Sequence, residues 1–238
     1  MISIVIPALN EEDSIGDTVR RTNLTLNESG TEPFEIIVVD DGSTDQTAEL
    51  ATQAGARVIS HPHNIGYGKS LKDGIAAATY ETIVISDADG TYPIEEIPYL
   101  VEELNRGFDM VVGQRTGAHY RESRIKSPLR MLLRAIVEYT AGRSIPDINS
   151  GLRAFHRDTV LEFFPQLCDT FSFTTSLTLA YLMRGKFVAY RKIDYRDRTG
   201  STKVRLLRDS LRTFQYILEV STYYNPLKIF LLFASFCI

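Results

Sequence analysis

The sequence predicts an α/β domain built on a mostly parallel sheet, and three observations support this prediction. Short apolar, β-branched runs alternate with longer segments whose apolar residues recur at helical spacing. Each apolar run is followed at once by polar residues rich in Asp, Gly, Asn and Ser. Hydrophobic residues make up 44% and charged residues 24% of the 238 residues, which excludes a disordered, fibrous or coiled-coil protein.

Five strands are predicted in the first half of the chain. Strands of a parallel sheet are covered by helices on both faces, so their sequences are continuously apolar rather than alternating. The runs EIIVVD and TIVIS have this character and are rich in the β-branched residues that strands favour. The strands are expected at Ile2–Pro7, Glu35–Asp40, Arg57–Ser60, Thr82–Ser86 and Asp109–Gly113.

Four helices are predicted between these strands. In the first, Ile15, Val19 and Leu26 recur at helical spacing, and acidic residues occupy the first turn, where the helix dipole favours them. Strands that alternate with helices of this length indicate a parallel sheet, and ligands of such sheets bind beyond the carboxyl ends of the strands. The helices are expected at Glu11–Leu26, Asp45–Ala54, Gly66–Thr79 and Ile94–Arg106.

The second half is more basic and less regular. Strands are expected at Leu152–Phe155 and Phe187–Ile193, and helices at Arg121–Arg143, Phe173–Met183 and Lys203–Tyr224. The last helix is amphipathic, because leucines and a phenylalanine recur on one side and arginines on the other. Pro226 is expected to end it. This helix could lie on a membrane surface or pack against the rest of the domain.

The charge is distributed unevenly along the chain. Residues 1–112 carry 6 lysines and arginines against 20 aspartates and glutamates, a formal charge of −14. Residues 113–238 carry 20 against 10, a formal charge of +10. This asymmetry indicates two surfaces with different partners. The alternative for part of these charges is that they lie on ordinary solvent-exposed faces of helices.

The two ends of the chain and its cysteines bear on location. The N-terminus has no basic segment and only a short apolar one, so it is not a signal peptide. No 18-residue apolar run is present, but the ten residues 229–238 are uncharged and mostly apolar. We expect the segment 226–238 to begin a membrane anchor, the alternative being a buried terminal helix or strand. Two cysteines, Cys168 and Cys237, form no disulfide framework, which favours a reducing compartment.

Asp87 and Asp89 follow a predicted buried strand. Two carboxylates at this spacing can bind one divalent cation, and such a cation neutralises a departing diphosphate. The alternative is a plain acidic turn, since Asp and Gly are common turn residues.

A second acidic loop contains Asp41 and Asp45. Asp41 is expected to contact a ligand, and Asp45 is expected mainly to cap the next helix.

Basic residues suited to phosphate groups occur in the second half. They are Arg115, the cluster within 121–134, and the loop from Arg198 to Lys203. Neither a phosphate-binding P-loop nor a dinucleotide fingerprint is present.

His61 and His63 form part of a loop rather than a zinc site, because no third ligand is apparent. No nucleophile-elbow motif supports Ser–His–Asp hydrolysis.

Six segments together resemble the family 2 glycosyltransferases of GT-A fold. Within that family they are most similar to the polyprenyl-phosphate sugar transferases, the group of dolichol-phosphate mannose synthase, over about residues 1–225. The segments are IVIPALNEE, EIIVVDDGSTDQT, TIVISDADG, VVGQR, DINSGLRAF and RDRTGSTK. The resemblance implies a GT-A catalytic domain over 1–225, with a donor and metal half at 1–112, an acceptor half at 113–202 and an amphipathic interface helix at 203–225.

The resemblance also implies roles for individual residues. Asp87, Asp89 and Arg115 would act directly in the reaction, and Asp87, Asp89 and Thr91 would bind the metal. Acceptor-phosphate contacts would come from Lys126, Arg130 and Arg198. The nucleotide-sugar contacts would be Pro7, Leu9, Glu11, Val39, Asp41, Asp87, Ala88, Asp89, Arg115, Arg198 and Lys203.

This sequence departs from the family pattern at three places. Leu9 stands where an aromatic residue is frequent, and Thr91 where Gln is frequent. The basic loop is one residue shorter between Arg198 and Lys203 than in the mannose synthases, which weakens the case for GDP-mannose as donor.

The implied activity is a metal-dependent hexosyl transfer, with inversion, from GDP-mannose or a UDP-sugar to a polyprenyl phosphate. The cofactor would be Mg²⁺ or Mn²⁺, and the expected location is the cytoplasmic face of a membrane. The partners would be the nucleotide sugar, the lipid phosphate and the membrane surface, with no nucleic acid; the sequence sets no oligomeric state. Two alternatives stay open: a GT-A enzyme with a soluble hydroxyl acceptor, for which Asp147 could act as a base, and a non-catalytic nucleotide-sugar-binding partner of a membrane protein.

Overall fold

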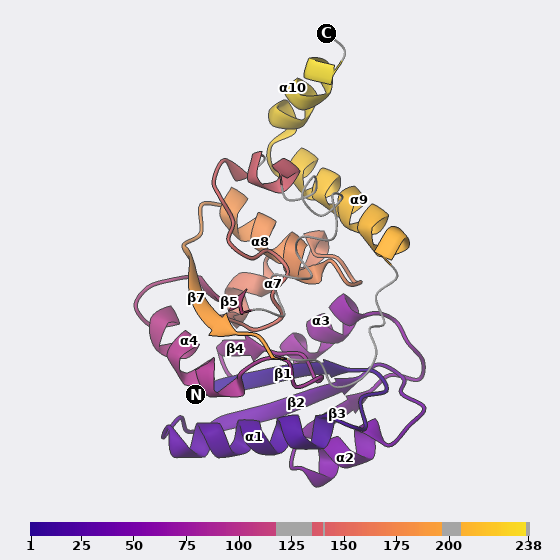
Figure 1. The fold of residues 1–238 in the computed structure, drawn as a ribbon, viewed down its shortest axis with the longest axis vertical. Coiled ribbons are helices and arrows are strands. Elements are labelled where there is room, and N and C mark those ends of the chain that lie inside the picture. The colour runs from indigo at the N-terminus through magenta and orange to yellow at the C-terminus, as the bar shows by residue number, and fades with distance from the viewer. Residues whose placement is uncertain (118–134, 140, 197–205, 237–238) are drawn as a thin grey trace.

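A seven-stranded sheet forms the centre of the computed structural model, which describes residues 1–117, 135–139, 141–196 and 206–236 (Figure 1). The strand order is β3-β2-β1-β4-β6-β5-β7. Only β6 runs antiparallel to its neighbours, so the predicted mostly parallel sheet is confirmed. The strands are β1 (Ile2–Ala8), β2 (Phe34–Asp40), β3 (Arg57–Ser60), β4 (Thr82–Ile85), β5 (Met110–Thr116), β6 (Arg153–His156) and β7 (Val188–Asp194).

Helices cover both faces of the sheet, and each face has its own hydrophobic core (Figure 1). Val5 of β1 points into one core with residues of α3, α8 and α9, whereas Ile4 and Ile6 point into the other with α1 and α4. The helices are α1 (Ile15–Glu28), α2 (Thr47–Gln53), α3 (Tyr67–Ala77), α4 (Ile97–Leu104), α7 (Arg157–Leu161), α8 (Phe173–Met183), α9 (Leu206–Tyr224) and α10 (Pro226–Phe236), with short 3₁₀ turns η1 (Ile94–Glu96) and η2 (Phe164–Gln166).

The predicted elements are present wherever the structure describes them. The first helix begins four residues later than expected, at Ile15 rather than Glu11. Residues 11–14 form a turn in which the Ser14 and Ile15 N–H groups donate to the Glu11 carbonyl oxygen, and the Glu11 and Glu12 N–H groups donate to Thr47 Oγ1 and Asp45 Oδ2. Most of the predicted helix at 121–143 lies outside the described residues.

The C-terminal part consists of two consecutive helices. Helix α9 ends at Tyr224, and Pro226 is the first residue of α10, a position where its missing N–H costs nothing. Helix α10 extends away from the sheet (Figure 1). Among the described residues, no helix is both long enough and apolar enough to span a bilayer.

Candidate active site

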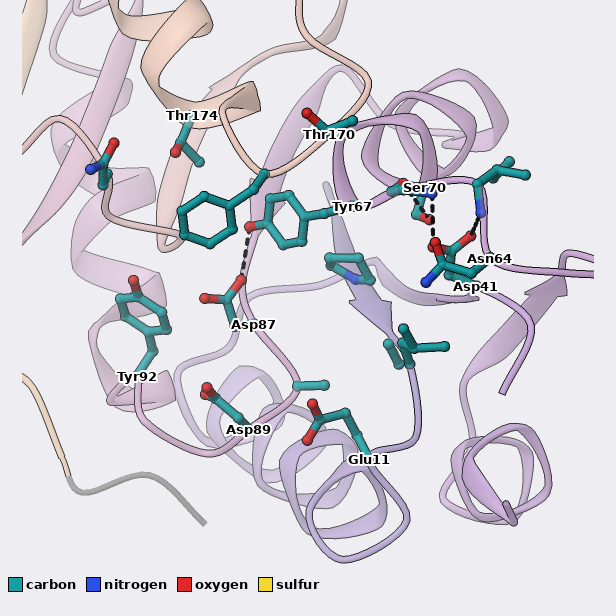
Figure 2. A pocket seen from close by; sticks show the side chains of 18 of the residues that line it. Glu11, Asp41, Asn64, Tyr67, Ser70, Asp87, Asp89, Tyr92, Thr170 and Thr174 are labelled. Carbon is teal, nitrogen blue, oxygen red and sulfur yellow. Dashed lines mark hydrogen bonds between the residues drawn. The ribbon is translucent and has the colours of Figure 1, made fainter. Parts of the chain in front are cut away.

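A cavity of about 540 Å³ opens at the carboxyl ends of β1, β2 and β4, where a parallel sheet of this kind binds its ligands (Figure 2). Its wall also includes residues from the loop after β3 and the start of α3, from β5, from the loop before β6, from the start of α8 and from the end of β7. The lining residues include eight predicted from the sequence: Pro7, Leu9, Glu11, Asp41, Asp87, Ala88, Asp89 and Arg115.

The other predicted residues lie elsewhere. The Val39 side chain is fully buried in the core on the α3 side of the sheet, and Thr91 is fully buried behind Asp89. Lys126, Arg130, Arg198 and Lys203 lie outside the described residues.

Asp87 is held in place from two sides. The Tyr67 hydroxyl donates a hydrogen bond to Asp87 Oδ1 at 2.8 Å (Figure 2). On the other side Gly151 packs so closely that a Cβ atom there would lie 2.7 Å from Asp87 Oδ2. Desolvation, followed by the Asp87 charge, raises the pKa of Tyr67 well above its usual value, so this phenol stays a donor at neutral pH.

Asp89 is oriented by a residue two positions further along the chain. Both the backbone N–H and the hydroxyl of Thr91 donate to Asp89 Oδ1, at 3.1 and 2.6 Å. Thr91 therefore supports the carboxylate in this structure, and its predicted part as a metal ligand stays a prediction.

Asp41 lines the cavity and also organises the loop that follows β3. Its Oδ1 lies 2.9 Å from His61 Nδ1 and accepts from the Ile65 N–H, and its Oδ2 accepts from the Gly66 N–H (Figure 2). His61 Nε2 lies 3.3 Å from Asp73 Oδ2. Among the described residues no group of three His, Cys, Asp or Glu side chains is arranged to hold a metal ion.

Arg115 makes a two-point ion pair with Asp147. Its Nε donates to Asp147 Oδ2 at 2.8 Å and its NH2 nitrogen to Oδ1 at 2.9 Å, and its guanidinium lies 5.4 Å from the centre of the Tyr195 ring. Asp147 also accepts from the Asn149 N–H, so its carboxylate holds the turn that precedes β6.

The turn 147–151 is fixed by a buried arginine. Arg153 is fully buried and donates to the carbonyl oxygens of Ser150 and Ile148 and to Thr178 Oγ1. The Gly151 N–H donates to the Tyr92 hydroxyl at 2.6 Å. One rigid turn therefore positions both the partner of Arg115 and the glycine that contacts Asp87.

The charge of the cavity is strongly negative. Of its described lining residues, Glu11, Asp41, Asp87 and Asp89 are carboxylates and Arg115 alone is basic. A bound diphosphate would be repelled unless a cation neutralised it. The donor atoms available are carboxylate oxygens, which suit Mg²⁺ or Mn²⁺ bound by one or two carboxylates and completed by substrate phosphate oxygens and water.

Several residues of the cavity escaped the sequence reasoning. Tyr67 and Asn64 come from the segment after β3, and Phe171 and Thr174 from the start of α8. The first pair could have been found, since their segment follows a predicted strand as the acidic loops do. Phe171 and Thr174 carry no such signal, because they precede or begin an apolar helix.

The chain belongs to glycosyl transferase family 2. The model of that family, described as "Glycosyl transferase family 2", matches residues 3–164. The sheet order and the acidic cavity at its carboxyl edge agree with this assignment.

Two curated relatives are polyprenyl-phosphate sugar transferases. An undecaprenyl-phosphate 4-deoxy-4-formamido-L-arabinose transferase from Yersinia enterocolitica is 33% identical over 77% of this chain and 60% of its own length. A dolichyl-phosphate hexose transferase from Haloferax volcanii is 28% identical over 85% of this chain and 86% of its own length. The chain thus spans three fifths or less of the length of these formamido-arabinose transferases.

The fold is that of GT-A glycosyltransferases, the class to which similar solved structures belong. Glucosyl-3-phosphoglycerate synthase from Mycobacterium tuberculosis, in complex with Mn²⁺, uridine diphosphate and glucosyl-3-phosphoglycerate, superposes with a TM-score of 0.74 at 25% identity. The match covers 93% of this chain and 80% of that one. The same enzyme has also been crystallised with Mg²⁺ and uridine diphosphate.

Proposed function

We propose that this chain transfers a sugar from a nucleoside-diphosphate sugar to a polyprenyl phosphate at a membrane surface. The observation that carries the proposal is the acidic cavity at the carboxyl ends of β1, β2 and β4, in a chain of glycosyl transferase family 2. The named activities of the two curated relatives support a lipid phosphate as acceptor. The catalytic domain would span 1–225.

In the proposed reaction an oxygen of the acceptor phosphate forms a bond to the anomeric carbon of the sugar. The bond from that carbon to the diphosphate oxygen breaks, and its electron pair leaves with the nucleoside diphosphate. A single displacement of this kind inverts the anomeric configuration. The acceptor phosphate is largely dianionic at neutral pH, since its second pKa is about 6, so no proton need be removed from it.

Asp87 and Asp89 would hold the divalent cation. When bound, Mg²⁺ or Mn²⁺ supplies positive charge to the departing diphosphate. The Tyr67 hydroxyl and Thr91 fix the two carboxylates, and Arg115, oriented by Asp147, supplies the second positive charge of the described cavity. Pro7, Leu9, Glu11 and Asp41 would contact the nucleotide, and Val39 could do so only through its backbone, because its side chain is buried in the core. Arg198 and Lys203 would contact its phosphates, and Lys126 and Arg130 the acceptor.

The C-terminal helices support a location at the membrane surface. Tyr223, Leu227, Phe230 and Leu231 of α9 and α10 are each more than half exposed, which is an unusual density of apolar surface for a protein in water. We propose that this segment contacts the cytoplasmic face of the membrane. Flotation with anionic liposomes at low salt tests this: the chain should float, and recovery wholly in the unbound fraction would contradict it.

Transfer of labelled sugar tests the reaction directly. The full chain is incubated with labelled UDP- and GDP-sugars, undecaprenyl or dolichyl phosphate, and Mg²⁺ or Mn²⁺. Label should pass into the lipid fraction with one donor and only with a divalent cation, and Asp89→Asn should abolish the transfer. Label in no lipid fraction for any pair would overturn the proposal.

A second candidate is transfer to a soluble, phosphorylated acceptor. It is favoured by the similar glucosyl-3-phosphoglycerate synthase, whose structures contain phosphoglyceric acid. Label recovered only in water-soluble products in the same assay would select this function instead.

A further inference from the structure

The N-terminus of α8 forms part of one wall of the cavity, and its N–H groups are only partly satisfied by the described residues. The Phe173 N–H donates to the Thr170 carbonyl oxygen and the Ser176 N–H to that of Ser172. Every residue from Phe173 to Leu182 of this helix is buried. The first turn has no side-chain cap hydrogen bond and no acidic residue. The N–H groups at a buried helix start need acceptors, and a ligand is one way to supply them.

Thr174, in this first turn, is a largely buried residue whose side chain lines the cavity. The residue is 4% exposed and lines the cavity, on the side opposite Asp89 and Glu11 (Figure 2). Within the described part of the chain, its hydroxyl has no hydrogen-bond partner, whereas the neighbouring Thr175 hydroxyl donates to Asn149. The Thr174 hydroxyl is not one of the fully enclosed, unpartnered polar atoms of the described residues, so a ligand in the cavity can reach it and accept a hydrogen bond from it.

The charge at this wall favours an anion. The positive end of the helix dipole and a hydroxyl donor lie together here. The carboxylates among the described cavity residues come instead from the loops after β1, β2 and β4. No acidic side chain in the first turn of α8 can act as a base toward a hydroxyl acceptor, but a phosphate acceptor needs none.

We propose that the N-terminus of α8, with the Thr174 hydroxyl, binds the phosphate group of the acceptor. The inference rests on the proposed function, and it adds a phosphate site on the wall opposite the carboxylates that would hold the donor diphosphate and its cation. The acceptor oxygen then approaches the sugar from the side away from the leaving diphosphate. No predicted acceptor residue lies on this helix, since the sequence reasoning placed those contacts at Lys126, Arg130 and Arg198.

The test measures acceptor binding apart from turnover. Binding of farnesyl monophosphate to the full chain is followed by calorimetry, and KM is measured for both substrates. Thr174→Val keeps the side-chain shape but removes the hydroxyl, so it should raise the farnesyl monophosphate Kd and the acceptor KM roughly 10-fold. It should leave the KM of the nucleotide sugar unchanged, and Thr174→Ser should behave like the wild type.

Two further variants make the test decisive. Thr174→Asp suits a helix N-terminus but repels an anion, so it should fold and lose farnesyl monophosphate binding. Thr22→Val is the matched control, because Thr22 is a fully buried helical threonine of α1, with its hydroxyl bonded to the Thr18 carbonyl oxygen. It should bind farnesyl monophosphate as the wild type does.

The outcomes separate the two proposals. Unchanged acceptor affinity in Thr174→Val and Thr174→Asp would overturn the α8 site, and so would a rise confined to the nucleotide-sugar KM, which would assign Thr174 to the donor sugar. Either result leaves the proposed function standing if the wild type transfers sugar to polyprenyl phosphate. Absence of that transfer in the wild type would instead contradict the proposed function.

Discussion

Arg115 and Asp147, 32 residues apart in the sequence, face each other through two parallel hydrogen bonds of 2.8 and 2.9 Å. The Asp147 side chain is 2% exposed and that of Arg115 is 17% exposed, so the pair is largely withdrawn from water. A planar guanidinium held at two points by a carboxylate has a fixed orientation. The turn before β6 therefore determines where the basic group of β5 points in the cavity.

Replacement of Asp147 by alanine should destabilise the protein strongly. The change leaves the Arg115 charge in the cavity wall without its partner, at a cost of about 3 kcal/mol and a fall in Tm of roughly 6–12 °C. Asp158→Ala is the control, because Asp158 is exposed and lies 3.8 Å from Arg157 in a surface pair. Differential scanning fluorimetry compares the two variants, and equal small shifts would contradict a structural role for the buried pair.

Replacement of Gly151 by alanine should impair metal use more than stability. The added Cβ would lie within 2.8 Å of both Asp87 carboxylate oxygens, so the carboxylate must move. Displacing such a group should weaken metal-dependent binding of UDP or GDP roughly 10-fold or more. Calorimetric titration with Mn²⁺ present measures the loss. Gly16→Ala is the matched control, since its Cβ would meet only the flexible end of the Arg20 side chain. A loss of nucleotide affinity of equal size in Gly16→Ala would contradict a specific effect of Gly151 on Asp87.

The Tyr67 hydroxyl is expected to tune the metal affinity of the site. Tyr67→Phe removes the hydrogen bond to Asp87 and should lower the apparent affinity for Mn²⁺ roughly 10-fold. Tyr99→Phe removes a hydroxyl from a residue that is half exposed and should change nothing. The Mn²⁺ dependence of sugar transfer in the two variants checks this, and identical curves would show that Asp87 keeps its position without Tyr67.

The strands and most helices could be predicted because their signals are local. Continuous β-branched runs such as EIIVVD fix a buried strand, and helical spacing fixes the face that packs on it. The first helix starts later than predicted because side chains of a distant segment, Thr47 and Asp45, accept from the Glu11 and Glu12 N–H groups and hold residues 11–14 as a turn. The same kind of long-range pairing places β6 antiparallel between β4 and β5, which no local pattern specifies.

The candidate site was predictable only in part, for a related reason. The acidic residues follow their strands directly, so the sequence places Asp41, Asp87 and Asp89 at one sheet edge. The groups that orient them come from distant segments. Gly151, 64 positions beyond Asp87, approaches it only because the sheet brings β6 beside β4.

Alkaline pH is expected to unfold this protein through its buried tyrosines. Burial raises the pKa values of Tyr67, Tyr92 and Tyr181 above the usual value for a phenol. Above pH of about 10 the unfolded chain therefore loses these protons while the folded chain keeps them, so stability is fully present below pH 10 and falls as the pH rises beyond it. Burial also raises the pKa values of Tyr190, Tyr195, Tyr216 and Tyr224. Each such group contributes a slope of up to about 1.4 kcal/mol per pH unit.

Tyr181→Phe isolates one of these contributions. The Tyr181 hydroxyl is buried without a hydrogen-bond partner among the described residues, so its removal should leave the free energy of unfolding at pH 7 unchanged or slightly higher. The alkaline slope should fall by up to about 1.4 kcal/mol per pH unit, because one group with a raised pKa is gone. Urea unfolding at a series of pH values from 8 to 11 measures both quantities, with Tyr99→Phe as the exposed control. A wild-type slope in Tyr181→Phe, or a large loss of stability at pH 7, would contradict the assignment of a solvent-free, unpaired phenol at this position.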